Sequence, residues 1–205
     1  MLSAFGLNCT LKRGDEPSST QKLLDQLLHA LEGYGVQTSS ERAANHDILP
    51  GVKTDEGPGD AWPALRKRID QAQILVLTTP IWMGQPSSVV KRVLERLDAV
   101  LGEIDDDGRY PTFGKVAVVG VVGNEDGAHH VTAELYQALA DVGFTIPAGS
   151  SAYWVGEAMS SKNYVDLKQT PEAVASAIQT LACNAAHLAG LLHERPYPAP
   201  GPARE

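Results

Sequence analysis

Residues 74–97 read ILVLTTPIWMGQPSSVVKRVLERL, and this stretch decides the fold that the sequence predicts. The run from Ile74 to Thr79 contains no charged residue, which is typical of a strand covered on both faces of a parallel sheet. From about Pro86 to Leu101 the apolar residues recur at helical spacing, at Val90, Val93, Leu94, Leu97 and Leu101. A strand, a loop and a helix in this order form one unit of an α/β domain.

The same alternation extends along most of the chain. Further runs of strand length lie at 2–7, near Val36, at 116–122 and at 152–155. Two more helical stripes comprise Leu24, Leu27, Leu28 and Leu31, and Val131, Leu135, Leu139 and Val142. We therefore expect a doubly wound sheet of about five strands with helices on both faces.

A last helix is predicted with Thr170 as its N-cap and Pro171 at its first position, ending before Pro196. Residues 44–60 and 102–114 read as exposed loops. The run Asp105 to Asp107 lacks the spacing of a calcium loop and reads as a solvated turn. These features predict one domain over residues 1–195, followed by a proline-rich tail over 196–205.

The composition of the chain argues against several classes of partner and site. The 205 residues include 17 lysine and arginine against 25 aspartate and glutamate, a formal charge of −8, which argues against a nucleic-acid partner and favours a small molecule. Two cysteines cannot form a disulfide framework or a four-thiolate cluster. The chain shows neither a signal-peptide pattern nor an apolar run long enough to span a membrane. We expect a cytoplasmic protein with no membrane association.

Ligands of open parallel sheets bind beyond the carboxyl ends of the strands, so the loops there are the candidate sites. The first loop runs from Asn8 to Thr20 and enters a helix. Its hydroxyls and the free N–H groups of that helix would hold a phosphate, although Ser18 or Ser19 acting only as a helix cap is the alternative. Cys9 lies where low-molecular-weight tyrosine phosphatases carry a nucleophilic cysteine. In those enzymes an arginine follows six positions after the cysteine, whereas Arg13 follows Cys9 by four. Cys9 therefore reads as a small loop residue.

The second loop, residues 78–88, places Trp82 and Met83 beside Gly84. Apolar side chains at a loop tip suit a flat apolar ligand, Gly84 would allow the backbone to approach it, and N–H groups of residues 81–84 would bond a polar ring edge. The alternative is that Trp82 is buried beneath a neighbouring loop.

Residues 79–97 resemble the T-P-I-Y-W-G-x-x-S-x-x-L-K-x-x-x-D-R signature of NAD(P)H-dependent FMN reductases and the related flavodoxin-like quinone reductases. The first loop resembles the G-S-x-R-x-x-S-x-T phosphate loop of that family, with Asn8 and Cys9 in place of Gly-Ser. The third loop, residues 123–130, resembles the T-G-G-x-x-G loop and matches it at Gly123 and Gly127.

The resemblance implies a flavodoxin-like three-layer sandwich whose five-stranded parallel sheet has the order 2-1-3-4-5. It implies FMN, with its phosphate near the first loop and its ring against the other two. The expected cofactor-binding residues are Cys9, Thr10, Ser18, Ser19, Thr20, Pro80, Ile81, Trp82, Met83, Gly84, Gly123, Asn124, Glu125, Gly127 and His130. It also implies a homodimer, or a tetramer, in which a second subunit helps to form the pocket.

The activity so implied is hydride transfer from NADPH or NADH to FMN, and then to a small acceptor such as flavin or a quinone. No catalytic side chain and no metal are expected, because the flavin N5 carries the chemistry and His129 and His130 lie in no metal-binding motif. One of these histidines would contact the flavin, or both merely begin a helix. Tyr153 and Trp154 would either line the substrate side of the flavin ring or pack in the core. A non-enzymatic electron carrier, or a fold member that has lost FMN, is the alternative.

Overall fold

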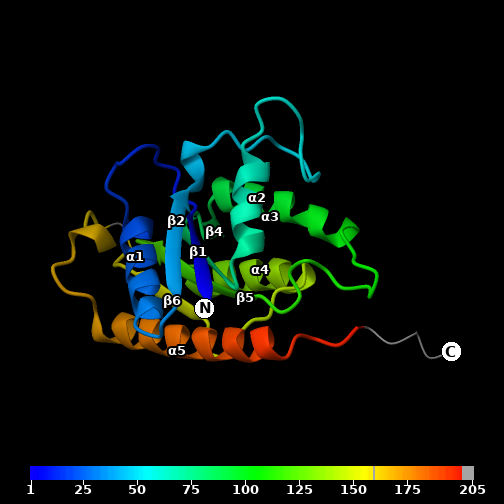
Figure 1. The fold of residues 1–205 in the computed structure, drawn as a ribbon. Coiled ribbons are helices and arrows are strands. Elements are labelled where there is room, and N and C mark those ends of the chain that lie inside the picture. Colours follow the sequence, from blue (N-terminus) through cyan, green and yellow to red (C-terminus); the bar gives the residue numbers. More distant parts are fainter. Residues whose placement is uncertain (159, 200–205) are drawn as a thin grey trace.

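The computed structural model of the protein describes residues 1–158 and 160–199. A parallel sheet in the order β2-β1-β3-β5-β6 forms its centre (Figure 1). Its strands are β1 (Ser3–Asn8), β2 (Gln37–Arg42), β3 (Ile74–Trp82), β5 (Val116–Gly123) and β6 (Ser151–Val155). The two-residue β4 (Gln85–Pro86) pairs antiparallel with the end of β3. Apart from β4, the order reads 2-1-3-4-5, which confirms the predicted sheet.

Helices cover both faces of this sheet, as the sequence predicts (Figure 1). On one face lie α1 (Ser19–Glu32) and α5 (Glu172–Glu194); on the other lie α2 (Trp62–Gln71), α3 (Ser88–Leu97) and α4 (Ala128–Asp141). Three short 3-10 helices complete the set: η1 (Ala43–Asn45), η2 (Asp98–Gly102) and η3 (Tyr164–Asp166). The three layers form the flavodoxin-like sandwich.

Close packing of α1 on the sheet places the start of this helix at the carboxyl end of the strands. A Cβ atom at Gly120 of β5 would lie 2.8 Å from the methyl group of Thr78 and 3.0 Å from Leu23 of α1. Glycine at this position therefore lets the helix rest directly on the strand. The predicted stripe of four leucines on α1 is buried against the sheet.

Some element boundaries differ from the sequence prediction. The strand expected near Val36 is β2, whose residues QTSSER are largely polar; as an edge strand it carries polar side chains without burying them. Helix α2 was not predicted, although Trp62, Leu65 and Ile69 form its buried stripe. The helix expected to reach Leu101 divides into α3 and η2, and α5 begins one residue late, with Pro171 at its N-cap.

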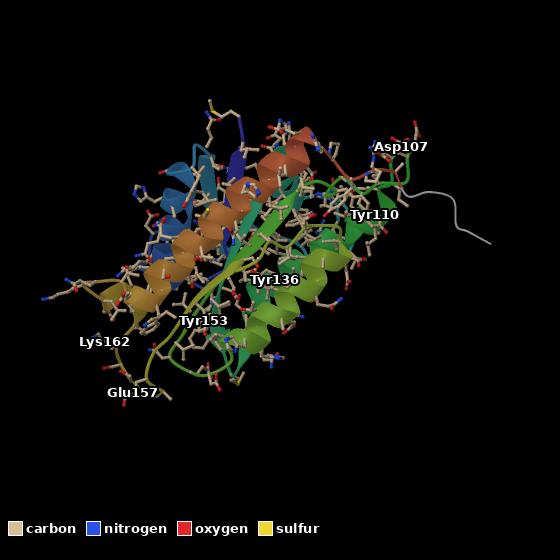
Figure 2. The ribbon with its side chains drawn as sticks, turned by 90° about the horizontal axis from the view of Figure 1, so that it is seen from below. Asp107, Tyr110, Tyr136, Tyr153, Glu157 and Lys162 are labelled. Carbon is tan, nitrogen blue, oxygen red and sulfur yellow. The ribbon has the colours of Figure 1, made fainter. Side chains whose placement is uncertain are left out.

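The two ends of the sheet carry different loops. Figure 2 shows Glu157 and Lys162 towards one end of the molecule, and Asp107 and Tyr110 towards the other. Residues 200–205 of the predicted proline-rich tail lie outside the described residues. Over residues 1–158 and 160–199, none of the helices combines the length and the apolar character that a membrane crossing requires.

Candidate functional site

A cavity of about 470 Å³ opens beyond the carboxyl ends of β1, β3, β5 and β6. One side is lined by hydroxyl groups and a lysine, and another by aromatic side chains. The lining residues are Thr10, Lys12, Ser18, Ser19, Thr20, Pro80, Ile81, Trp82, Val122, Gly123, Asn124, Glu125, Trp154, Ala158, Asn163 and Val165.

The polar side of the cavity is built around the start of α1. Ser18 is the N-cap, and its Oγ accepts a hydrogen bond from the backbone N–H of Gln21 at 3.3 Å. The N–H groups of Ser19 and Thr20, at the first helical positions, have no acceptor within the helix. The Lys12 ammonium donates to the carbonyl of Pro17 at 2.7 Å and retains two further N–H donors. Together these groups are suited to holding an oxyanion, with a positive charge beside it.

Buried hydrogen bonds hold the first loop against its neighbours. The Asn8 side chain donates to Gln21 at 2.7 Å and accepts from the backbone N–H of Thr10 at 3.0 Å. The Ser87 hydroxyl, at the N-cap of α3, donates to the carbonyl of Cys9 at 2.6 Å. These bonds join the loop after β1 to the segment after β3, so the two sides of the cavity are fixed relative to each other.

Cys9 lies in the core beneath the loop and does not line the cavity. It is fully buried, and desolvation by burial raises the pKa of its thiol well above the usual range. A neutral, buried thiol is a poor nucleophile. The structure therefore agrees with Cys9 as a small packing residue.

The aromatic side is formed where β3 turns back as β4. The segment predicted as a loop is a hairpin, because β3 continues to Trp82 and pairs with Gln85 and Pro86. Met83 and Gly84 form its turn, with φ angles of 52° and 73°, as two-residue hairpin turns with positive φ require. Trp82 lines the cavity with 52% of its surface exposed, so it is not buried beneath another loop.

The loop after β5 supports this hairpin. The Glu125 carboxylate accepts a hydrogen bond from the Met83 N–H at 2.7 Å. A Cβ atom at Gly127 would lie 2.9 Å from the Cα and O atoms of Gly84, so the two backbones touch. A Cβ atom at Gly123 would lie 2.8 Å from Cβ of Ile81. Glycine at 123 and 127 is therefore needed for loop packing.

The connection from β6 to α5 forms another wall of the cavity. The Lys22 ammonium of α1 anchors it, donating to the carbonyls of Leu167 at 2.7 Å and Tyr164 at 3.1 Å. The Val165 N–H donates to Ser19 Oγ at 3.1 Å. Trp154, at the end of β6, packs at 5.5 Å between ring centroids on the buried Tyr164.

Ten of the fifteen predicted binding residues lie together in this cavity: Thr10, Ser18, Ser19, Thr20, Pro80, Ile81, Trp82, Gly123, Asn124 and Glu125. Five others do not line it: Cys9, Met83, Gly84, Gly127 and His130. His130 instead contacts Gln85 at 3.3 Å, and the neighbouring His129 contacts the Tyr153 hydroxyl at 3.1 Å.

Sequence reasoning missed several lining residues. Lys12 carries a recognisable signal, because it is a basic residue inside the expected phosphate loop. Trp154 was considered as either a wall or a core residue, and it lines the cavity. Ala158, Asn163 and Val165 belong to no motif and are brought in by the fold. Within the described ranges, no group of three or more His, Cys, Asp or Glu side chains is arranged to hold a metal ion.

The family model for NADPH-dependent FMN reductase matches residues 4–160. Two curated relatives are similar to the chain. The divalent metal cation transporter MntH of Mycobacterium bovis is 41% identical over 169 residues, which cover 80% of this chain and 25% of that protein. The chain thus spans a quarter of this relative's length. The 8-demethyl-8-aminoriboflavin-5'-phosphate synthase of Streptomyces davaonensis is 34% identical over 207 residues, covering 96% of this chain and 80% of the relative.

Solved structures show the same likeness. RosB with the bound intermediate 8-demethyl-8-formylriboflavin-5'-phosphate has a TM-score of 0.88 at 34% identity, covering 96% of this chain and 82% of that one. An archaeal flavodoxin has a TM-score of 0.59 at 7% identity, covering 92% and 99% of the two chains. At that low identity the flavodoxin shows the shared fold alone.

Proposed function

The chain belongs to the NADPH-dependent FMN reductase family, and on that premise we propose that it is a NAD(P)H-dependent reductase that delivers electrons to a small acceptor such as free flavin or a quinone. It is a flavin-dependent oxidoreductase that uses FMN and NAD(P)H. The observation that carries the proposal is the cavity itself, which joins an oxyanion site to an aromatic wall at the carboxyl ends of the strands.

The residues present fit FMN. Lys12, the hydroxyls of residues 18–20 and the free N–H groups at the start of α1 supply donors for a phosphate, and no carboxylate lies among them. Trp82 and Trp154 supply flat apolar surfaces for a ring system. The close approach of Gly123 to Ile81 keeps the floor of the cavity clear of a further side chain. The cavity thus offers a phosphate end and an aromatic end to one elongated ligand.

FMN, when bound, supplies the hydride-accepting chemistry. The protein binds and orients: Lys12 and the start of α1 would hold the phosphate, which sets the position of the ring relative to the hairpin. Trp82 would support the ring. The connection after β6 would form one wall beside the bound flavin. No side chain is required to move a proton in the hydride step, so none is assigned a catalytic role.

Visible spectroscopy of the purified protein tests this proposal. We expect a bound flavin that chromatography identifies as FMN, and bleaching of its absorption on anaerobic addition of NADPH or NADH. Turnover with an acceptor panel would then identify the acceptor. Bound FMN that neither coenzyme bleaches would instead indicate an electron carrier, and a colourless protein that fails to bind added FMN would indicate a fold member that has lost the cofactor.

A second candidate function treats the flavin phosphate as the substrate. It is favoured by the relative from Streptomyces davaonensis, whose name describes synthesis of a modified riboflavin phosphate and whose 34% identity extends over 96% of this chain. Mass spectrometry of the flavin recovered after turnover separates the two functions. A reductase returns FMN of unchanged mass, whereas a flavin-modifying enzyme returns a flavin of altered mass.

We also propose a homodimer, with a tetramer as the larger possibility, because the resemblance to the family implies one. Half-exposed Trp82 and exposed Met83 at the rim of the cavity are compatible with a neighbouring subunit. Sedimentation velocity measures the state directly, and a purely monomeric protein at micromolar concentration would contradict it.

A further inference from the structure

A second cavity, of about 290 Å³, lies on the other side of the loop that follows β1. It is lined by apolar side chains from three segments and by basic side chains at their edges: Leu11, Arg13, Ala43, Ala44, His46, Ile48, Ser88, Val89 and Arg92. None of these lining residues is acidic, although the protein has a formal charge of −8. A cavity of this composition selects for an anion that carries an apolar group.

The two cavities share one loop segment, residues 10–13. Thr10 and Lys12 line the flavin cavity, whereas Leu11 and Arg13 line the second cavity. Successive residues of this loop therefore face different cavities, and the loop lies between the two sites.

The two arginines of this cavity are only loosely paired with carboxylates. Arg13 and Asp47 lie 3.6 Å apart, with exposed side chains, and Arg92 and Glu95 are also 3.6 Å apart. Arg92 is held in place by a hydrogen bond from its Nη1 to the carbonyl of Ile48 at 3.0 Å. A phosphate with several oxygens competes well against such long, exposed pairs, because charge-assisted bonds to arginine are short and often bidentate.

We propose that this second cavity binds the adenosine 2'-phosphate of NADPH, with the adenine against Leu11 and Ile48 and the phosphate between Arg13 and Arg92. The inference rests on the proposed function, since it assigns a place to the far half of the coenzyme whose nicotinamide enters the flavin cavity. It makes the protein selective for NADPH over NADH, which lacks the 2'-phosphate.

Replacement of Arg13 tests the site. Its side chain is 74% exposed and, among the described residues, has only the long pair to Asp47, so Arg13→Ser is expected to fold normally. Calorimetric titration of the FMN-loaded protein with adenosine 2'-monophosphate and 5'-monophosphate should show preference for the 2'-phosphate. Removing a hydrogen bond to a charged group costs about 1.5–3 kcal/mol, so Arg13→Ser should weaken 2'-monophosphate binding roughly tenfold to a hundredfold.

Lys67→Ser is the matched control, because it removes the same charge from an exposed position on α2 that lines neither cavity. It should leave both titrations unchanged. In turnover, Arg13→Ser should raise KM for NADPH by a similar factor and leave KM for NADH and both kcat values near those of the wild type.

Three results would overturn the proposal: no binding of the 2'-monophosphate to the wild type, equal binding by Arg13→Ser, or an equal rise of KM for both coenzymes. The last result would show that Arg13 contacts a part of the coenzyme that NADH and NADPH share. If neither coenzyme is oxidised, the proposed function fails, whereas the titration still decides independently whether the cavity binds a 2'-phosphate.

Discussion

Two loops at the carboxyl ends of neighbouring strands use their polar groups in opposite ways. The loop after β2, residues 46–61, and the loop after β1, residues 9–18, both rise at the top of Figure 1. In the loop after β2, polar side chains bind one another and the backbone. In the loop after β1, polar side chains face a cavity. The comparison separates polar residues that maintain the fold from polar residues that are available to a ligand.

The loop after β2 is closed around a buried ion pair. Arg96 and Asp60 are fully buried, with Nη1 and Oδ2 2.8 Å apart. Arg96 also donates to the carbonyls of Leu49 at 2.9 Å and Lys53 at 2.7 Å. Asp60 accepts from backbone N–H groups of Leu49, Glu56 and Trp62. With these partners, Arg96 and Asp60 have little hydrogen-bonding capacity left for a ligand.

The loop after β1 differs because the Lys12 ammonium makes one hydrogen bond among the described residues, to the carbonyl of Pro17, and is exposed. The hydroxyls of Ser18 and Ser19 accept backbone hydrogen bonds but can still donate one each. The loop therefore keeps free donors directed at the cavity.

The largest expected effect comes from opening the buried pair. Arg96→Met leaves the Asp60 carboxylate buried without its charge partner, which costs about 3–5 kcal/mol of stability. Urea unfolding should show this loss. The double variant Arg96→Met with Asp60→Asn should recover much of it, because no buried charge is left unpaired. If the single variant unfolds like the wild type, the pair does not stabilise the loop.

The same pair should make stability fall at low pH. Burial opposes ionisation of Asp60, but hydrogen bonds from three backbone N–H groups and from Arg96 outweigh it, so the pKa of Asp60 lies below its usual value. The unfolded carboxyl titrates at about 3.9. The contribution is thus fully present above that value and lost as pH falls through the folded pKa. Urea midpoints should separate wild type from Asp60→Asn at pH 6 and converge towards pH 2; a constant gap would contradict this.

On the cavity side, Lys12→Met should leave stability almost unchanged and weaken FMN binding. Losing a charge-assisted hydrogen bond to the phosphate costs about 1.5–3 kcal/mol, or about tenfold to a hundredfold in Kd. Fluorescence titration with riboflavin is the control, because riboflavin lacks the phosphate and should bind both proteins equally. Equal weakening for both flavins would place Lys12 against the ring instead.

The tryptophans provide a matched comparison of the two regions. Trp82→Leu removes a half-exposed ring from the cavity and should weaken FMN binding by about 0.5–1.5 kcal/mol with little loss of stability. Trp62→Leu removes a fully buried ring beside Arg96 and should reduce stability instead. FMN titration and urea unfolding of both variants measure the contrast. Similar profiles would show that the regions are not separate in function.

The smallest effect on FMN binding is expected at Glu125. Glu125→Ala frees the Met83 N–H and should loosen the hairpin tip by about 0.5–1.5 kcal/mol. Amide hydrogen exchange at Met83 should speed up, while FMN affinity falls only slightly. Asp126→Ala is the control, since Asp126 accepts from the adjacent Gly127 and does not line the cavity. Unchanged exchange in Glu125→Ala would show that the hydrogen bond does not hold the turn.

Much of the fold could be predicted because its signals are local. The uncharged run from Ile74 and the helical stripe from Val90 each lie within one element, and the repeated alternation predicts the sheet order once the family resemblance is added. β2 and α2 were harder to predict, because their local signals are weaker. β2 is polar because it lies at an edge, and α2 is short and follows a loop rich in glycine.

The site was predictable where a motif marks it. Ser18 and Trp82 lie in motif segments and line the cavity. Gly84 and Gly127 were expected near the ring, but the structure places them against each other, since two loops far apart in sequence must pass closely. Val165 could not be found from the sequence, because its place depends on Lys22 binding carbonyls about 140 residues away.

The sequence alone determined the α/β alternation, the family and the three loops that surround the ligand, since periodicity and motifs act over a few residues. Only the tertiary structure decided which polar groups remain free. Arg13 and Arg96 are the same type of residue, and the sequence alone does not show which of them is buried. In the structure the Arg13 side chain is exposed at a cavity, whereas the Arg96 side chain is fully buried against Asp60. Burial and partnership depend on contacts between distant segments, and these contacts exist only after the chain has folded.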